Sequence, residues 1–404
     1  MKRDFDVVIV GAGVVGLTLA AQLCRSVHKD RLRITIVDAA ARPAPLDDVE
    51  MDVRVSAIST GSTAILEAAG AWPLVNKSRI CAYTDMRVWD ASGAVEGPET
   101  LCFSAADYAL RQLGCIAENK MLQHALLEAL QRDRQSVRFA TAVRSIDRRQ
   151  DRYDLRLATD ETISADLLIA ADGGNSFVRK QAGIGSKGWQ YDQTAFVTHL
   201  KAENPHGNTA WQRFLETGPI ALLPLADGRV SLVWSTTPEQ AAEAYEMTDA
   251  ELGSAVSAAT DYVLGSLEPA GPRGAFPLRA TYAKEYVQPG LALIGDAAHS
   301  VHPLAGQGAN LGLADAACLA GVVERALDAN EVIGDFRVLR RYERARKGAN
   351  QTMLLFIDGI NRLFSTRDPA VTALRSSGMR LFNRSGPVRD RAVRVALGLD
   401  SYAA

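Results

Sequence analysis

Three glycines with the spacing G-x-G-x-x-G follow an apolar run near the start of the chain. Residues 7–10 are Val-Val-Ile-Val, which indicates a buried parallel strand, and the glycines are Gly11, Gly13 and Gly16. After a strand, the first glycine permits a tight turn, the second lets a pyrophosphate approach the backbone, and the third lets helix and strand pack closely. Asp38 ends the next predicted strand, where an acid can bind the ribose hydroxyls of adenosine. This spacing predicts dinucleotide binding.

A second G-x-G-x-x-G is formed by Gly183, Gly185 and Gly188. It follows a helix-like stretch and precedes a strand, which is the reverse of the order that phosphate binding needs. We therefore expect no separate nicotinamide-binding domain.

Two further predicted strands end in an acid beside glycine. They lead into Asp172-Gly173 and into Gly295-Asp296. In this order after the first motif, they resemble the D-G and G-D motifs of the flavoprotein aromatic hydroxylases, which are single-component, FAD-dependent monooxygenases. The resemblance covers nearly the whole chain.

Four longer segments are similar to a narrower group, the ubiquinone-biosynthesis hydroxylases. They are residues 52–59, 113–119, 218–225 and 295–312. The resemblance implies that NADH or NADPH reduces FAD and that O2 adds at flavin C4a. The resulting hydroperoxide then passes one oxygen to the aromatic ring of a polyprenylated phenol or quinone precursor. The alternatives are a soluble, non-quinone aromatic substrate, and a non-catalytic prenyl-binding protein on the same fold.

The resemblance also assigns residues to the cofactor. Asp296 is expected to hold the FAD ribitol, and Asp172, supported by Arg179, lies near the pyrophosphate and the site of NAD(P)H handling. Asn119 stands where the family usually has Arg or Gln reaching the flavin, with Glu118 as a neighbouring candidate.

Arg54 is either a surface charge or a flavin-side contact that matches the family's D-x-R segment.

The segment from residue 303 to 310 has a chemistry of its own. Pro303 ends a loop in which Gly306, Gln307 and Gly308 bring bare backbone close to a ligand. A helix then starts around Ala309 and Asn310, and its N–H groups favour negative charge on the flavin N1–C2=O edge. We assign no general base and no other catalytic residue.

His299 and His302 are spaced i, i+3, as metal ligands can be. No third ligand lies nearby in the sequence, and His-Pro breaks the helix that such a pair needs, so we expect no metal. His299 is expected to order the G-D loop instead.

The chain is too long for one ordinary core, since 404 residues exceed the roughly 250–300 at which single cores stop growing. We expect an α/β fold with an FAD-binding, Rossmann-like domain of the para-hydroxybenzoate hydroxylase type, an antiparallel β-sheet substrate domain and a helical C-terminus. The expected boundaries are 1–185 with 286–334, then 186–285, then 335–404. Whether some of residues 75–110 belong to the substrate domain is left open.

The expected elements follow the apolar pattern. Helices are predicted from Val14 to Cys24, over 115–131 and over 335–365, and strands over 34–37, 152–157, 162–171, 189–200, 211–215, 220–225, 229–234 and 291–294. The antiparallel sheet is expected to form one wall of the substrate pocket, lined by Leu222, Pro224 and Trp234 because a prenylated ring needs apolar walls.

Composition excludes several functions. The net charge of −2 does not favour nucleic-acid binding, and five cysteines without a CxxC pair indicate neither a zinc ribbon nor a dithiol site. We see no signal peptide and no apolar run that could span a bilayer. The chain is therefore expected in the cytoplasm.

A polyprenylated substrate suggests contact with the inner face of a membrane through the C-terminal region. A homo-oligomer or a biosynthetic complex is left open. The apolar candidates for the membrane contact are Met353, Leu354, Ile357, Ile360, Leu363 and Phe364, and the basic ones are Arg375, Arg380, Arg384, Arg389, Arg391 and Arg394.

Overall fold

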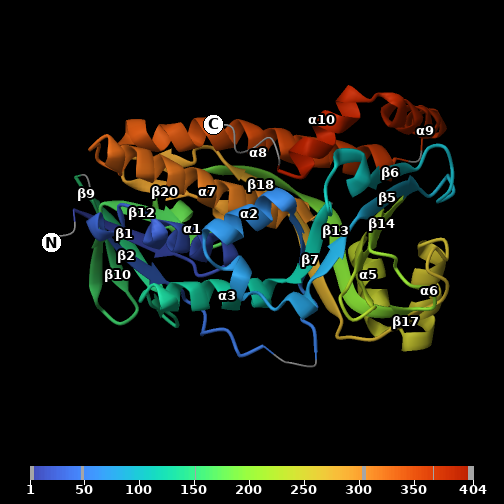
Figure 1. The fold of residues 1–404 in the computed structure, drawn as a ribbon, viewed down its shortest axis with the longest axis horizontal. Coiled ribbons are helices and arrows are strands. Elements are labelled where there is room, and N and C mark those ends of the chain that lie inside the picture. Colours follow the sequence, from blue (N-terminus) through green and yellow to red (C-terminus); the bar gives the residue numbers. More distant parts are fainter. Residues whose placement is uncertain (1–3, 47–49, 151, 303–305, 367, 399–404) are drawn as a thin grey trace.

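The computed structural model describes residues 4–46, 50–150, 152–302, 306–366 and 368–398. Two large sheets, one mostly parallel and one mostly antiparallel, lie at opposite ends of the long axis of the molecule (Figure 1). The fold is the expected one, and the domain boundaries given above stay predictions.

The first sheet contains the dinucleotide-binding unit. Its strand order within the described chain is β19-β20-β12-β1-β2-β8, and all neighbouring pairs are parallel except β19 with β20. The strands are β1 (Phe5–Val10), β2 (Leu32–Val37), β8 (Val137–Arg138), β12 (Leu167–Ala170), β19 (Val287–Gln288) and β20 (Leu291–Leu293). Because β1 lies between β12 and β2, the carboxyl ends of all three meet at one edge, where ligands bind in such sheets.

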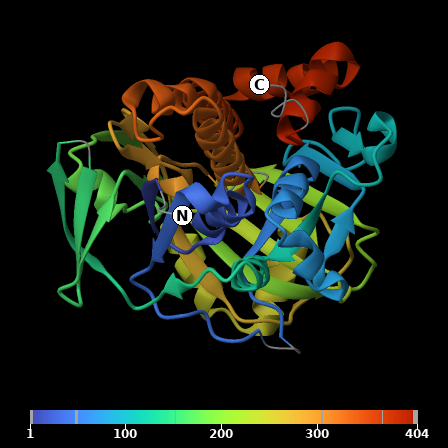
Figure 2. The ribbon, with the colours of Figure 1, turned by 60° about the vertical axis from the view of Figure 1, so that its left-hand side comes forward.

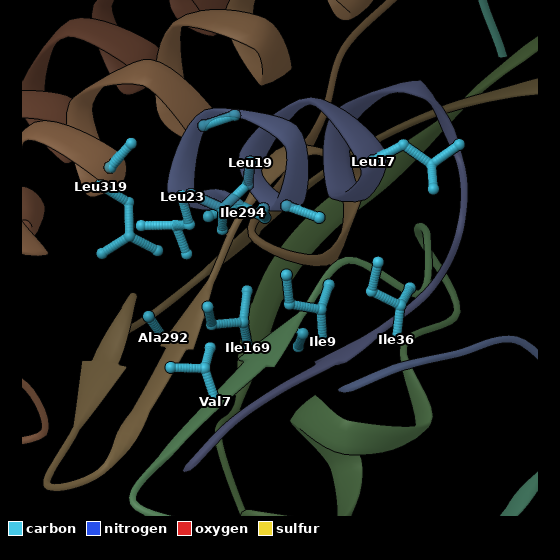
Figure 3. Close-up of a cluster of buried hydrophobic side chains, with 14 of the residues drawn as sticks. Val7, Ile9, Leu17, Leu19, Leu23, Ile36, Ile169, Ala292, Ile294 and Leu319 are labelled. Carbon is cyan, nitrogen blue, oxygen red and sulfur yellow. The ribbon is translucent and has the colours of Figure 1, made fainter. Parts of the chain in front are cut away.

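Helices cover this sheet on the side shown in Figure 3. Leu19 and Leu23 of α1 (Val14–Arg25) lie over Val7, Ile9 and Ile169 of the strands, with Leu319 of α7 (Gln307–Asp328) beside them. Continuous apolar strands buried on both faces explain this core. α3 (Asn119–Arg132) packs against α1.

The second sheet has the order β21-β18-β13-β16-β15-β14-β5-β6, with β17 added beside β13. The strands are β5 (Asp85–Asp90), β6 (Leu101–Ser104), β13 (Ser186–Ala202), β14 (Thr209–Leu215), β15 (Gly218–Pro224), β16 (Val230–Thr236), β17 (Leu267–Pro269), β18 (Gly274–Ala283) and β21 (His299–Ser300). β5 and β6 come from the segment 75–110 and extend this sheet. α5 (Pro238–Glu246) and α6 (Asp249–Ala259) pack on one of its faces, at the lower right of Figure 1.

Smaller elements join the two sheets or flank them. One small sheet pairs β7 (Gly114–Glu118) with β3 (Val55–Ser59) and β4 (Cys81–Tyr83); another comprises β9 (Val143–Arg149), β10 (Arg152–Leu157) and β11 (Thr162–Ala165), seen at the left of Figure 2. The helices among them are α2 (Thr60–Ala68), α4 (Phe177–Gln181) and the 3-10 turns η1 (Lys29–Arg31), η2 (Trp72–Leu74), η3 (Lys77–Arg79), η4 (Ala105–Tyr108) and η5 (Gly295–Ala297).

Two predicted elements are corrected. The helix over 115–131 is wrong at its start, because residues 114–118 form β7 and the helix begins only at Asn119. The single strand over 162–171 is two strands, since the chain leaves one sheet after Ala165 and enters the other at Leu167. A short apolar run does not by itself distinguish strand from helix.

The C-terminal region is helical, with α8 (Phe336–Ser365), α9 (Pro369–Arg384) and α10 (Pro387–Ala396) at the top of Figure 1. The apolar face predicted for lipid is mostly the core-facing one, because Leu354, Ile357 and Phe364 are buried. The exposed large apolar residues of α8 are instead Phe336, Leu355, Phe356 and, from the predicted set, Leu363. None of the described helices is long and apolar enough to cross a membrane.

Two of the predicted lipid-binding arginines are also corrected. Arg375 is buried and pairs with Asp90 of β5 at 2.5 Å, while Arg389 is half-buried and lies over the Phe103 ring. Both side chains fix helices onto the antiparallel sheet and are not free to meet a lipid. Arg380, Arg391 and Arg394 are exposed.

Candidate active site

A cavity of about 850 Å³ lies where the two large sheets meet. From the dinucleotide-binding side it is lined by the turn before α1, the G-D segment, the start of α7 and the segment before β3. The opposite wall is formed by strands β13, β14, β15, β16 and β18. Of the predicted cofactor and loop residues, those on the cavity are Gly13, Arg54, Asn119, Asp296, Gly306, Gly308 and Ala309.

The three glycines of the first turn have different surroundings. A Cβ on Gly11 would lie 2.2 Å from the carbonyl oxygen of Ala171, and one on Gly16 would lie 2.2 Å from that of Gly11. A Cβ on Gly13 would meet nothing within 4 Å, and Gly13 is the one that faces the cavity. The close contacts therefore pack the turn, while the open side of Gly13 leaves room for a ligand group at the backbone.

Asp38 holds this turn from outside the cavity lining. Its carboxylate accepts hydrogen bonds from the N–H groups of Ala12 at 2.6 Å and Ala40 at 2.7 Å. The end of β2 is thereby tied to the glycine turn. Its contact with a ribose stays a prediction.

Two helix N-termini face the cavity without caps. The N-cap residue is Gly13 for α1 and Gly306 for α7, and neither helix has a side-chain cap or an acid in its first turn. The first N–H groups of a helix lack intrahelical partners and carry partial positive charge. The cavity thus offers two places for negative charge, one at each helix start.

The G-D segment is held by a buried ionic network. Asp315 of α7 accepts from the N–H of Gly295 at 3.1 Å, contacts His299 Nε2 at 2.5 Å, and pairs with Arg346 of α8 at 2.8 Å. Burial would raise the pKa of Asp315, but His299 and Arg346 lower it to about 2. Asp315 therefore stays ionised and fixes the loop that carries Asp296.

Asp296 itself points into the cavity and retains solvent access there. The surrounding protein raises the pKa of its carboxyl, because the ionised form loses hydration. A ligand hydroxyl that donates a hydrogen bond to this carboxylate would replace the hydration that the ionised form loses.

Sequence reasoning did not identify Asp315 or Arg346. The available signal was an acid inside the Ala- and Leu-rich stretch of residues 311–323, where an unpaired charge would be costly.

Asp172 and Arg179 order the D-G segment from behind the cavity. The Asp172 carboxylate accepts from Ser176 Oγ at 2.6 Å and from the N–H of Val178 at 3.1 Å. Arg179 is buried and donates to the carbonyls of Ala297 at 2.6 Å and Gly174 at 2.8 Å, which joins the D-G segment to the G-D segment. Burial lowers the pKa of Arg179, with Asp172 opposing that shift.

Asn119 lies on the cavity and its Oδ1 accepts from Ser56 Oγ at 2.6 Å. The alternative candidate, Glu118, is buried in an ion pair with Arg79 at 2.7 Å and does not line the cavity. Arg54 does line it and lies 5.5 Å from the centre of the Phe276 ring across the cavity.

Three predicted residues of the segment 303–310 are not among the described residues that line the large cavity. Pro303 falls outside the described residues. Asn310 is buried behind the loop, where its amide donates to the carbonyls of Ala57 and Gly306 and accepts from the N–H of Ser59. Gln307 lines a small second pocket beside Asn310. Asn310 thus positions the loop and does not itself reach the large cavity.

The substrate-wall residues were predicted on the wrong face of their strands. Leu222 and Trp234 pack in the core beneath α5 and α6. Pro224 lies two residues after Leu222 on β15 and therefore on the same face of the sheet. The residues of β13 to β16 that do line the cavity are Ala195, Val197, Ala210, Trp211, Gln212, Pro219, Ala221, Leu223, Val233 and Ser235, with Phe276, Pro277, Leu278 and Arg279 on β18. Since side chains alternate between faces, a one-residue error in parity moves every predicted contact.

The two histidines are not arranged as metal ligands. His299 contacts Asp315, while His302 is buried and lies 3.3 Å from Gln193 Oε1. Burial lowers the pKa of His302 to about 4. No group of three potential ligands occurs among the residues that the structure describes.

Comparison with known proteins decides the family. The model of a family described as "FAD binding domain" matches residues 4–355. The chain belongs to this FAD-binding family. Its relatives include the 3-demethoxyubiquinol 3-hydroxylase of Escherichia coli, 37% identical over 98% of this chain and 100% of that protein. The human ubiquinone biosynthesis monooxygenase COQ6 is 35% identical over 97% of this chain and 92% of its own length.

Solved structures show the same fold for this FAD-binding protein. The p-nitrophenol 4-monooxygenase PnpA of Pseudomonas putida matches with a TM-score of 0.76 over 98% of this chain and 99% of its own, at 17% identity. HpxO of Klebsiella pneumoniae, complexed with FAD and uric acid, matches with 0.75 over 97% and 96%, at 19% identity. The chain is an FAD-dependent monooxygenase, as its relatives are named.

The residues present fit FAD. The open Gly13 and the uncapped start of α1 suit a pyrophosphate, and the uncapped start of α7 suits the flavin edge that becomes negative on reduction. Asp296 suits a ribitol hydroxyl. We expect these residues to hold the cofactor.

Proposed function

We propose that this monooxygenase hydroxylates the aromatic ring of a polyprenylated phenol or quinone precursor in ubiquinone biosynthesis, with NADH or NADPH as reductant. Full-length similarity to the hydroxylase of E. coli carries the proposal. The cavity supports it, because a polar cofactor side faces a strand wall whose side chains are mostly apolar.

When bound, FAD would supply the oxygen chemistry, accepting two electrons from NAD(P)H and reacting with O2. The protein supplies the site. The starts of α1 and α7 stabilise negative charge, and Asp296 orients the cofactor chain. The apolar strand wall holds the substrate and displaces water from the place of reaction. Ala221, Leu223 and Val233 leave room for a ring and for the start of an apolar tail.

The test uses the purified holoenzyme. It should be yellow, and a prenylated phenol should stimulate its oxidation of NADH or NADPH. With ¹⁸O2, one labelled oxygen should appear in the phenol product. A set of soluble phenols without a prenyl chain provides the comparison. Equal or faster labelling of those phenols would favour the soluble-substrate alternative, and a colourless protein that binds prenyl phenol would favour the non-catalytic alternative.

We also propose that the C-terminal helices contact an anionic lipid surface from which this substrate is taken. The exposed apolar side chains Leu355, Phe356 and Leu381 lie on α8 and α9, with the exposed Arg380 beside Leu381 in sequence. Apolar side chains near basic ones favour anionic lipids, at about 1 kcal/mol per charge near the surface.

Flotation with vesicles of phosphatidylglycerol and phosphatidylcholine tests this contact. The wild type should float at low salt, and Leu355→Ser/Phe356→Ser should not. The matched control is Arg144→Glu/Arg149→Glu on the distant β9 strand, which should float like the wild type. A wild type that stays at the bottom would contradict the lipid contact and favour a partner protein or a second copy at this surface.

A further inference from the structure

Gln212 is a buried amide on the strand wall of the cavity. It lies on β14, is only 6% exposed, and lines the cavity. The strand register places Gln212 beside Ala221, Ala221 beside Val233, and Val233 beside Val197. On its other side Gln212 lies beside Val88 of β5, so it is the polar member of a row of side chains that is otherwise apolar.

The amide of Gln212 has no hydrogen-bond partner among the described residues. Gln193, another buried glutamine on the same sheet, shows the usual situation: its amide donates to the Thr217 carbonyl at 2.7 Å and accepts from Asn361 at 3.2 Å. The amide atoms of Gln212 are not among the fully buried side-chain atoms, so they reach the cavity, where a ligand can hydrogen-bond them. The cavity that Gln212 lines has room for such a ligand.

The wall around Gln212 restricts what that ligand can be. Along β13, β14, β15 and β16 the cavity-lining side chains are apolar or aromatic, except those of Gln212 and Ser235, and on β18 the charged Arg279 also lines the cavity. A hydrocarbon tail can contact these residues but cannot satisfy an amide. A ring hydroxyl can donate to Oε1, and a ring oxygen can accept from Nε2.

We propose that Gln212 binds an oxygen substituent of the substrate ring and thereby sets which ring carbon is hydroxylated. This inference rests on the function proposed above and adds the residue that orients the ring. One amide that offers both a donor and an acceptor fixes the rotation of a flat ring that apolar walls leave free to turn.

The experiment compares Gln212→Leu with the wild-type holoenzyme. The probes are a prenylated phenol with a single isoprene unit and the same compound with hydrogen in place of its hydroxyl. Dissociation constants come from the change in flavin absorption on titration. The wild type should bind the phenol more tightly than the deoxy compound. Gln212→Leu should weaken phenol binding about tenfold and change binding of the deoxy compound less than twofold.

A second readout is the position of the new hydroxyl. The wild type should yield one ring isomer and Gln212→Leu a mixture, while FAD content and melting temperature stay unchanged. Ser231→Ala is the matched control, because Ser231 is a buried polar residue of β16 on the same face but does not line the cavity. It should behave like the wild type.

The outcomes separate the two proposals. A wild type that neither binds nor oxidises the phenol contradicts the proposed function. A wild type that does both, with Gln212→Leu binding the two probes as before and yielding one isomer, overturns the role of Gln212. Equal weakening for both probes also overturns it, since that result indicates a change of shape and not a lost hydrogen bond.

Discussion

The two walls of the cavity are built in different ways. On the cofactor side the contacts come from backbone at turns and helix starts, at Gly13, Gly306 and Gly308. On the opposite side they come from alternate side chains of strands, such as Ala221 and Val233. The role of a glycine turn can be predicted from residue type and spacing. The face on which a strand side chain lies depends on whether its position is odd or even in the strand, and residue types alone do not reveal this.

The largest expected effect concerns Asp315, which holds the cofactor side of the cavity in place. Asp315→Ala should lower the free energy of unfolding by about 4 kcal/mol, because it leaves the charge of buried Arg346 without its acidic partner. Urea unfolding of the purified protein measures this. Asp328→Asn on the same helix is the control, since its side chain is 66% exposed, and it should cost less than about 0.5 kcal/mol. Similar losses in both variants would contradict the role given to Asp315.

Gly13→Val should weaken FAD binding by about 3 kcal/mol, roughly a hundredfold in Kd, while the protein still folds. The added side chain would enter the open space beside the turn. FAD retention after gel filtration and the melting temperature of the apoprotein are the measurements. Gly16→Val should instead fail to fold, since its Cβ would meet backbone. A fully yellow Gly13→Val protein would show that this turn does not receive the pyrophosphate.

The third prediction uses two buried histidines, His199 of β13 and His302, whose Nε2 lies 3.3 Å from Oε1 of Gln193 on the same strand. Burial lowers the pKa of His199 and of His302 to about 4, from an ordinary 6.5. Between these values the unfolded chain binds more protons than the folded one, so stability falls as pH falls from 6.5 to 4. Each histidine should cost about 2 kcal/mol at pH 5 relative to pH 7.5.

Urea unfolding at both pH values tests this. His199→Leu and His302→Leu should each lose less stability on acidification than the wild type. Curves that run parallel to the wild type would contradict the neutral, buried state of that histidine.

The smallest expected effect tests the parity of the strand wall. Ala221→Phe should raise KM for the prenylated phenol about tenfold with FAD content unchanged, because the ring would occupy cavity space. Trp234→Phe, on the opposite face, should change KM less than twofold. A larger change of KM in Trp234→Phe than in Ala221→Phe would instead support Leu222, Pro224 and Trp234 as the substrate wall.

Much of the fold could be predicted because its signals are local. The buried run of residues 7–10, the glycine spacing after it and the apolar run of residues 291–294 each fix an element within a few residues. The start of α3 was missed because the apolar residues 115–117 suit a strand and a helix equally. The long α8 was predicted, but its buried and exposed faces were not distinguished.

The sequence by itself determined the dinucleotide-binding unit, the two later acid-and-glycine turns and the glycine loop that starts α7, because these need particular residue types at fixed spacing. Only the tertiary structure decided which of these residues reach the cavity. Asp38, Asp172 and Asn310 hydrogen-bond the backbone behind it, while Asp296 faces into it. The face of each strand, the pairing of Asp315 with Arg346 and the open amide of Gln212 depend on register between segments far apart in the chain, and no local pattern encodes that register.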